Sequence, residues 1–402
     1  MKKQSLRLQS EGKFSILIFF LFISILIFPF LSVKAQYQKS VHPKDSLIQI
    51  IITSDLHYGI KRPYFRGDSN VAASVVNAAM VKEMNTLPNM ELPTDNGMNT
   101  DRKIKSIDYV FVTGDIANRM EAKDKIQSAS ISWAQFNNDF FKNLSVKNPL
   151  RQRAPVLMIP GNHDVSNAIG YYKKMSPLTD KTSMVQIYNL MMHPKVKRTT
   201  MTFNFEKDKI NYSKNIGGIH FCFIQMWPDS SERIWLDKDL KKINKKAPVV
   251  IVAHDAPDVE AKHFSSPNNK GSIRNSDEFY NVLDEHFKDG KSVEDSAVIE
   301  QNQFAAFLKK HTNIKAYIHG DIHENKYYLW KGPEENVSLN TVSIGSPMKG
   351  KITREDETQL TFDLLTIDTK NKSMTFRECF WNTNPSAPLS SIVWGKSMTI
   401  DF

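Results

Sequence analysis

Cysteine is nearly absent from this sequence, which contains only Cys222 and Cys379 among its 402 residues. Two cysteines exclude a disulfide-rich scaffold, and there is no CxxC pair to bind zinc. Each cysteine lies inside an apolar run, so two buried thiols and a single disulfide are both compatible with the sequence. The chemistry of this protein is therefore expected to depend on other side chains.

Internal repeats and low-complexity tracts are also absent, which excludes a solenoid or fibrous protein. The composition is 41% hydrophobic and 24% charged, as in ordinary soluble globular proteins, and this excludes a disordered chain. The length is sufficient for one large domain or two small ones.

The only long apolar run is at the N-terminus. Four basic residues precede it, the run covers 14–28, and Pro29 and the small-residue site at Val33 and Ala35 follow. This order predicts a signal peptide over residues 1–35 and a secreted or periplasmic protein. The alternative is an uncleaved anchor, because apolar residues continue over 14–33 and a membrane span needs about 20 of them. Membrane contact is expected only in that case.

A strong excess of one charge is missing as well. The formal net charge is +10, and removal of residues 1–35 takes away five basic residues and one acidic residue, which leaves about +6. Such a mild excess is explained by solubility, and nucleic acid is not an expected partner.

Apolar, β-branched runs alternate with helix-like stretches along the rest of the chain. Strands are predicted at 48–54, 109–113, 156–160, 219–226, 249–253, 316–319, 341–344, 360–367 and 373–380. Helices are predicted at 71–87, 131–144, 232–243 and 302–311. The alternation indicates an α/β layered fold, and the last two strands, with no helix between them, are expected to pair antiparallel. We predict a single domain over 36–402, with long loops at 58–106 and 257–296 that shape a substrate site.

Five clusters of metal-seeking residues occur in one order, and most of them follow an apolar run. They are Asp55-Leu56-His57, Gly114-Asp115, Gly161-Asn162-His163-Asp164, His254 and Gly320-Asp321-Ile322-His323. Any one of them is weak evidence. The ordered set is strong, because the carboxyl ends of strands in an open α/β sheet meet at one edge and bring such side chains together. The set supplies oxygen and nitrogen ligands for two metal ions.

This ordered pattern resembles that of the calcineurin-like metallophosphoesterase superfamily, which is D-x-H, G-D, G-N-H-[DE], H and G-H-x-H. The resemblance covers roughly residues 48–350 and implies a pair of mixed β-sheets packed as a sandwich and flanked by helices. Purple acid phosphatases differ from the chain, because they have glycine where this sequence has His57 and tyrosine where it has Asn118.

The resemblance also implies a role for each motif residue. Asp55, His57 and His323 would hold one metal ion, Asp115 would bridge to a second, and Asn162 and His254 would complete that second site. His163 would protonate the leaving oxygen or stabilise the transition state, and Asp164 would orient it. The expected cofactors are two divalent ions among Mn, Zn, Mg and Fe.

Asp321 departs from this pattern, because it stands where the family has a histidine. A carboxylate is a competent ligand, so Asp321 itself is one candidate for completing the second metal site. His319, two residues earlier on a strand, is another, since it would point to the same side. The third possibility is a weakened second site.

The sequence therefore predicts a secreted, metal-dependent hydrolase of small-molecule phosphate mono- or diesters, in which a hydroxide between two metal ions attacks phosphorus. Arg119 and Tyr58 are candidates for binding substrate, and Arg62 and Arg66 could also line the pocket. The alternative is a non-catalytic metal-binding interaction module on the same fold.

Overall fold

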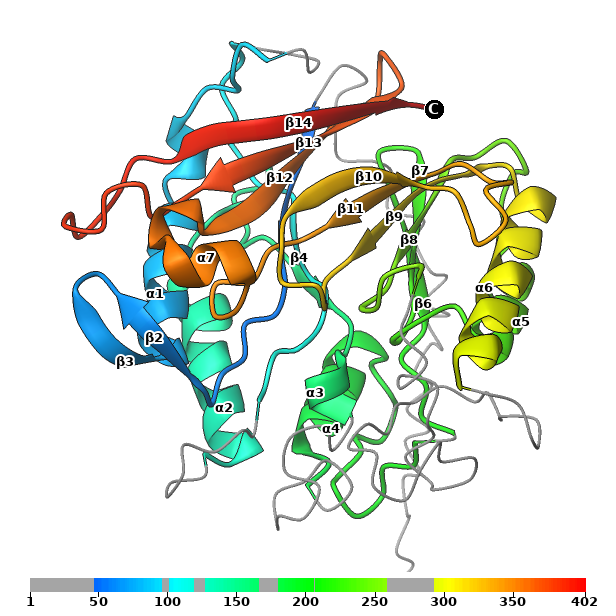
Figure 1. Ribbon diagram of the computed structural model, residues 1–402, viewed down its shortest axis with the longest axis horizontal. Coiled ribbons are helices and arrows are strands. Elements are labelled where there is room, and N and C mark those ends of the chain that lie inside the picture. Colours follow the sequence, from blue (N-terminus) through cyan, green and yellow to red (C-terminus); the bar gives the residue numbers. More distant parts are fainter. Residues whose placement is uncertain (1–46, 96–100, 119–126, 166–179, 206, 259–292) are drawn as a thin grey trace, which may run out of the picture. The chain divides into compact units, whose positions relative to one another are not determined.

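Two six-stranded mixed β-sheets form the framework of the protein (Figure 1). The computed structural model describes residues 47–95, 101–118, 127–165, 180–205, 207–258 and 293–402, and all of them belong to one structural unit that starts at Ser40. The predicted signal peptide, Arg119 and most of the segment 257–296 lie outside the described residues.

The first sheet has the strand order β14-β13-β12-β1-β4-β5. Strand β1 pairs parallel with β4 and antiparallel with β12, and β12 pairs antiparallel with β13 as expected. The strands are β1 (Leu47–Thr53), β4 (Tyr109–Val112), β5 (Val156–Met158), β12 (Thr361–Asp368), β13 (Ser373–Phe380) and β14 (Val393–Asp401).

The second sheet has the order β10-β11-β9-β8-β7-β6, and its four central strands run parallel. Its strands are β6 (Tyr212–Ile216), β7 (Ile219–Phe223), β8 (Val249–Val252), β9 (Ile314–His319), β10 (Lys326–Trp330) and β11 (Leu339–Ser343). A separate hairpin joins β2 (Lys61–Phe65) and β3 (Asp68–Ala72).

The two sheets pack face to face through one apolar layer. Ile50 and Ile52 of β1 point into it, whereas Ile51 points to the opposite face, as the two-residue period of a strand requires. The ring of Phe111 lies 5.0 Å from that of Phe223 across the layer. Burial on both faces explains why these strands are continuous apolar runs.

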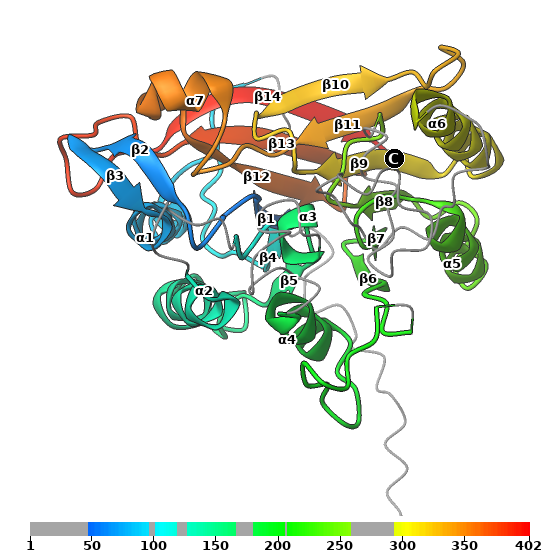
Figure 2. The same cartoon turned by 60° about the horizontal axis from the view of Figure 1, so that its bottom comes forward.

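Helices cover the outer faces of this sandwich. Figures 1 and 2 show α1 (Ala73–Met84) and α2 (Ala129–Phe136) beside the first sheet, and α5 (Ser230–Leu240) and α6 (Val293–Lys310) beside the second. The remaining helices are the π-helix η2 (Asn137–Asn143), the 3-10 helices η1 (Leu87–Asn89) and η4 (Glu357–Gln359), and α3 (Asn162–Val165), α4 (Thr182–Met191) and α7 (Lys351–Glu355). Among the described residues, no helix is long and apolar enough to cross a membrane.

The predicted fold class is confirmed: two mixed sheets flanked by helices. Within the segment 58–106, α1 lies inside the helix predicted at 71–87, whereas the β2–β3 hairpin was not predicted. Cys222 and Cys379 are both buried free thiols, so the disulfide alternative does not apply.

Candidate metal centre

The five predicted clusters converge at the carboxyl ends of five strands drawn from both sheets. Asp55 and His57 follow β1, Asp115 follows β4, and 161–164 follow β5, while His254 follows β8 and 320–323 follow β9. The backbone joins these loops directly: Asp55 N donates to Gly114 O at 3.1 Å, and Gly320 N donates to His254 O at 3.0 Å.

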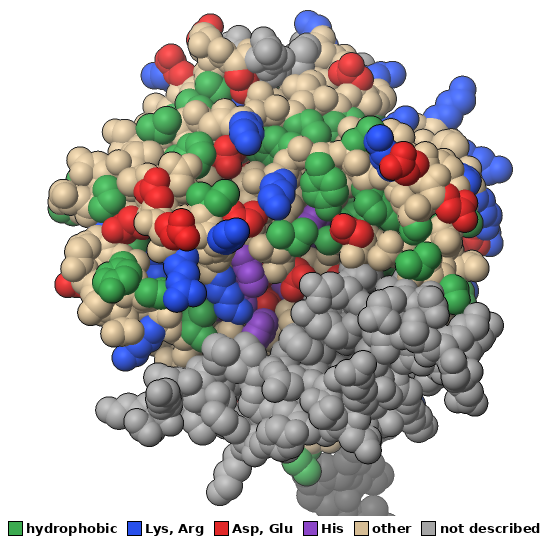
Figure 3. Space-filling view, in the orientation of Figure 1, with side chains coloured by type: hydrophobic (Ala, Val, Ile, Leu, Met, Phe, Trp, Pro, Cys, Tyr) green, Lys and Arg blue, Asp and Glu red, His purple; other side chains and the backbone are tan. Residues whose placement is uncertain are grey.

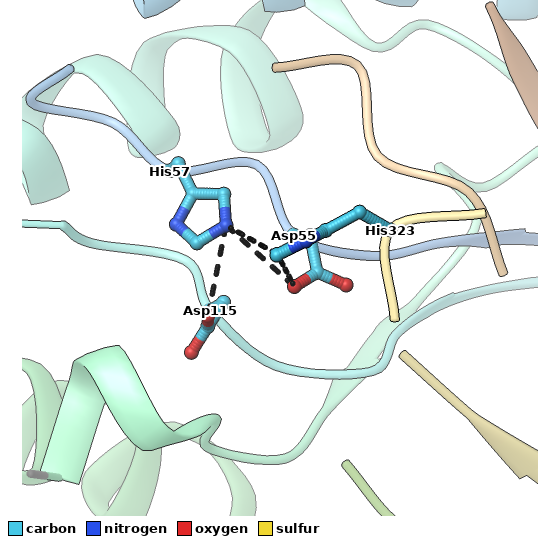
Figure 4. Close-up of side chains that lie close together, drawn as sticks. All are labelled: Asp55, His57, Asp115 and His323. Carbon is cyan, nitrogen blue, oxygen red and sulfur yellow. Dashed lines mark hydrogen bonds and ion pairs between the residues drawn. The ribbon is translucent and has the colours of Figure 1, made fainter. Parts of the chain in front are cut away.

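One group of ligand atoms comprises Asp55, His57, Asp115 and His323, and Figure 4 shows these side chains turned toward one another. The Nε2 atoms of His57 and His323 are 3.3 Å apart. Asp55 Oδ1 lies 3.2 Å from Nε2 of His323 and 3.6 Å from Nε2 of His57. Asp115 Oδ2 lies 3.6 Å from Nε2 of His57. Carboxylate and imidazole at these spacings form a ligand set for a divalent ion.

A second group surrounds Nε2 of His254. Asn162 Oδ1 lies 3.2 Å from this nitrogen, Asp115 Oδ1 lies 3.5 Å away, and Asp321 Oδ1 lies 3.8 Å away. Nδ1 of His254 is 2.7 Å from the carbonyl oxygen of Thr113, so it donates there and leaves Nε2 as the ligand atom. Asp115 therefore belongs to both groups, with one carboxylate oxygen turned to each.

Two of the seven predicted ligands each have a buried carboxylate atom with no hydrogen-bond partner among the described residues. These atoms are Asp55 Oδ1 and Asp115 Oδ2, and both side chains are essentially fully buried. Leaving a buried carboxylate oxygen unpaired is costly unless a cation compensates it. The donor set and these two carboxylate atoms, which face imidazole nitrogens of the same centre, fit a pair of bound metal ions.

Several side chains of this centre have pKa values far from their ordinary ones, because buried acidic and imidazole groups lie close together. Burial would lower the pKa of His254, but the negative charges of Asp115, Asp55 and Asp321 raise it to about 10. Burial raises the pKa of Asp115 well above its ordinary value, and burial lowers the pKa of His57 well below its own. A metal ion that binds here would replace the proton on His254.

The backbone of the centre is held in an unusual conformation. Five of the seven predicted ligands have a positive φ between 45° and 65°, namely Asp55, His57, Asp115, Asp321 and His323. Asp and His tolerate this left-handed region only at a cost, and such residues concentrate at functional sites. Strand ends that turn sharply in this way aim the side chains at one point.

Glycines at two of the strand ends allow this close packing. Gly114 has φ 106°, and a Cβ atom there would collide with the ring of His254 and the backbone of Gly161. A Cβ on Gly161 would collide with Asp115 itself. Larger residues at either position would displace His254 and Asp115, which the second group of ligands needs close together.

A family model described as Calcineurin-like phosphoesterase matches residues 48–325, more than half of the chain. The chain belongs to the calcineurin-like phosphoesterase family. A comparison with curated proteins finds no match.

Solved structures with a similar arrangement include a single mutant of Vps29 from Entamoeba histolytica, which is 10% identical with a TM-score of 0.31 over 88% of this chain and 99% of that chain. A 5'-nucleotidase precursor from Thermus thermophilus is 9% identical with a TM-score of 0.35, over 88% of this chain and 55% of that chain. Phosphopantetheinyl Hydrolase (PptH) from Mycobacterium tuberculosis is 13% identical with a TM-score of 0.32, over 77% and 92%. These values are too low to carry an argument about activity.

Asp321 and His319 are the two candidates for the ligand that a histidine supplies in the family, and their contacts in the structure differ. Asp321 faces the second group through Oδ1, and its backbone N–H donates to Asp55 Oδ2 at 3.1 Å. His319 is fully buried with Nδ1 2.8 Å from the carbonyl of Gly320 and Nε2 3.0 Å from the hydroxyl of Tyr328. Both ring nitrogens of His319 are therefore engaged, and Asp321 remains our predicted ligand.

Lys349 is a member of this centre that the sequence analysis missed. Its Nζ lies 3.3 Å from Nε2 of His163, and that nitrogen is 3.8 Å from Asp115 Oδ2. Burial lowers the pKa of Lys349, and the charges of Asp115, Asp55 and Asp321 oppose this shift. Ser346 fixes the loop, because its hydroxyl donates to Asp55 O at 2.7 Å and accepts from Lys349 N at 3.0 Å. The end of the predicted strand at 341–344 is the sequence signal that could have pointed to this loop.

Asp164 lies next to His163 in the chain, and its carboxylate accepts four hydrogen bonds. Its carboxylate accepts backbone N–H bonds from Ile116, Ala117 and Gly161, each at 3.0 Å, and the hydroxyl of Ser183 at 2.9 Å. None of these four bonds involves the His163 ring. The contacts indicate that Asp164 ties the loop after β4 to the loop after β5.

We expect Asp164→Asn to lower the free energy of unfolding by roughly 3 kcal/mol, because an amide group cannot accept from three N–H groups and a hydroxyl at once. Urea unfolding followed by circular dichroism measures this loss. The Ser183→Ala variant, which leaves the three backbone bonds intact, should lose less. Unchanged stability of Asp164→Asn together with a large loss of turnover would instead support a role in orienting His163.

The remaining candidates lie elsewhere. Tyr58 is fully buried, and its hydroxyl donates to Asp139 at 2.8 Å, so it offers no accessible group to a substrate and we no longer count it as a substrate-binding residue. Arg119 lies outside the described residues. Arg66 donates to Asn382 and Pro388 O, whereas Arg62 lines a cavity beside the metal centre.

Proposed function

We propose that this protein is a metal-dependent hydrolase of small-molecule phosphate mono- or diesters. The observation that carries the proposal is the position of Asp115, whose two carboxylate oxygens face separate groups of buried ligands. One carboxylate shared by two such groups is what a pair of metal ions acting on a single phosphate requires. Membership of the phosphoesterase family supports the same chemistry.

The residues divide into three roles. One metal ion would be held by Asp55, His57 and His323. The other would be held by Asn162, His254 and Asp321. Asp115 would contact both ions. Bound ions supply positive charge to the phosphoryl oxygens and lower the pKa of the attacking water. The Lys349 ammonium adds positive charge beside the same phosphate.

His163 is placed to act on the leaving group. Its Nε2 lies between the Lys349 ammonium and the Asp115 carboxylate, at 3.3 Å and 3.8 Å. When its Nε2 proton is directed away from the Lys349 ammonium, this imidazole can pass that proton to the departing oxygen. Its backbone N–H donates to Asp115 Oδ1 at 2.8 Å, which fixes the ring relative to the bridging carboxylate.

Turnover of p-nitrophenyl phosphate and of bis-(p-nitrophenyl) phosphate tests the proposal. The protein is stripped with a chelator and reloaded with Mn, Mg or Zn, and the rates of both substrates are compared. Metal-dependent hydrolysis of either ester is the expected result. Stoichiometric metal binding with no turnover of either would contradict it and favour a metal-binding interaction module.

Substitutions of Asp321 are expected to change the metal preference. Asp321→His restores a neutral nitrogen ligand, so activity should be retained while the preference shifts from the harder ions Mn and Mg toward Zn. Asp321→Ala should lower kcat/KM by about 10- to 100-fold, as the loss of groups that support a metal does. Metal content is measured by mass spectrometry alongside the rates. Insensitivity of both quantities to Asp321→Ala would contradict the ligand assignment.

We further propose that the protein is exported, with residues 1–35 acting as a signal peptide. Three features support this proposal: the basic residues at the N-terminus, the apolar run over 14–28 and the small-residue site at Val33 and Ala35. N-terminal sequencing of the protein from its native host would show Gln36 as the first residue. A chain that keeps residues 14–33 and sediments with membranes would favour the anchor.

A further inference from the structure

A cavity of about 710 Å³ opens beside the metal centre and shares its wall with it. His323 and Lys349 face the centre and also line this cavity. Other lining residues come from β2, through Lys61 and Arg62, and from α7. Figures 1 and 2 show β2 and α7 next to each other, and the guanidinium group of Arg62 joins them by donating to the carbonyl oxygens of Pro347 and Thr353.

Positive charge dominates the lining of the cavity. Five basic side chains line it against two acidic ones, and they are Lys61, Arg62, Lys349, Lys351 and Arg354. Figure 3 shows lysine and arginine side chains gathered beside the exposed histidine side chains. A cluster of this kind raises the local concentration of anions.

None of these five cations forms a salt bridge with a residue that the structure describes. Arg62 is 2% exposed and donates to backbone carbonyl oxygens only, those of Tyr64, Pro347 and Thr353. One of the two acids, Glu324, is already engaged, because its Oε1 accepts the backbone N–H groups of Lys351 at 2.5 Å and Ile352 at 3.2 Å. The lining therefore carries a net positive charge that no salt bridge to a described residue neutralises, and an anionic ligand would neutralise it.

We propose that this cavity binds a second anionic group of the substrate. The substrate class is then a phosphate ester that carries a further phosphate or carboxylate group, and the cavity selects it. Lys349 lies between the two subsites, since it contacts His163 on one side and lines the cavity on the other. This inference rests on the proposed function, because it deepens the choice of substrate at the same centre.

The geometry favours an anion over a neutral substituent. An anion in the cavity would form charge-assisted hydrogen bonds with the half-buried Lys349 and with the exposed cations, whereas a neutral group would leave the net positive charge of the lining uncompensated. Lys61 and Arg354 are exposed, so they can turn toward a bound anion at little cost to the fold.

Binding of non-hydrolysable probes tests the inference without turnover. Calorimetry on the Mn-loaded protein compares an alkylphosphonate with α,ω-alkyl bisphosphonates of increasing chain length and with ω-carboxyalkylphosphonates. We expect at least one bisphosphonate or carboxyphosphonate to bind about tenfold more tightly than the alkylphosphonate, as one additional charge-assisted contact would give. The two series distinguish a phosphate from a carboxylate at the second subsite.

The decisive comparison uses the double variant Lys61→Gln with Arg354→Gln. Its preference for the two-anion probe should fall to about twofold or less, because removing both cations takes away the contacts that produce it. The variant Lys245→Gln removes an exposed charge that does not line the cavity and should keep the preference. Metal chelation by the probe is the same in all three proteins, so it cannot produce the difference. No preference in the wild type, or an equal preference in the double variant, would overturn the inference.

Turnover of p-nitrophenyl phosphate separates this inference from the proposed function. Its rate in the Lys245→Gln control should stay within about twofold of the wild type, because Lys245 does not line the cavity. Turnover without any probe preference would contradict the second subsite alone. A probe preference without turnover would contradict the hydrolase and leave the anion subsite supported.

Discussion

Replacing Asp115 with asparagine is expected to lower kcat/KM by about a thousandfold or more, roughly 4 kcal/mol of transition-state stabilisation. Asp115 Oδ2 lies 3.6 Å from Nε2 of His57, and Oδ1 lies 3.5 Å from Nε2 of His254. An asparagine side chain has the same shape but only one acceptor oxygen and no charge, so it cannot serve both groups. Metal content, measured by mass spectrometry after dialysis, should fall together with the rate.

The matched control for this variant is Asp208→Asn, which alters a buried carboxylate that belongs to neither group of ligands. Asp208 pairs with Arg198 at 2.9 Å, so its substitution should cost stability and leave the metal content unchanged. Retention of two metal ions per chain and of the wild-type rate in Asp115→Asn would contradict the bridging role and, with it, the two-ion arrangement.

The central strands could be predicted from the sequence because each is a continuous apolar run. The bounds predicted for β1, 48–54, differ from the observed Leu47–Thr53 by one residue at each end, and β13 is matched in full. Strands β2, β3, β6, β10 and β14 were missed. They lie at sheet edges, where one side of the strand faces solvent, and polar residues such as Lys214 and Lys396 interrupt the apolar pattern.

The metal-binding clusters could be predicted because their residue types carry the chemistry and their order follows the strands. The contacts of Asp164 could not be predicted, since they depend on how the loop after β4 packs against Gly161 and Ser183. Lys349 was missed for a similar reason. A lone lysine after a strand has no pattern, and only the fold brings it to His163, 186 positions earlier in the chain.

The second large effect is expected for His163→Ala, which should lower kcat by about 10²- to 10⁴-fold for an alkyl phosphate, the range typical of a lost general acid. Metal content should not change, because His163 is not among the predicted ligands. The loss should be much smaller for p-nitrophenyl phosphate, since p-nitrophenolate departs without needing a proton. Rates for a series of esters with leaving groups of rising pKa measure this difference.

Lys349→Met separates proton donation from simple electrostatic support. Lys349 contributes charge beside the phosphate, so its loss should slow good and poor leaving groups by similar factors, whereas the loss from His163→Ala should grow with leaving-group pKa. Because Nζ of Lys349 lies 3.3 Å from Nε2 of His163, the double variant should lose less than the two single losses combined. A uniform loss across all leaving groups in His163→Ala would contradict the proton-donor role and leave His163 with transition-state stabilisation alone.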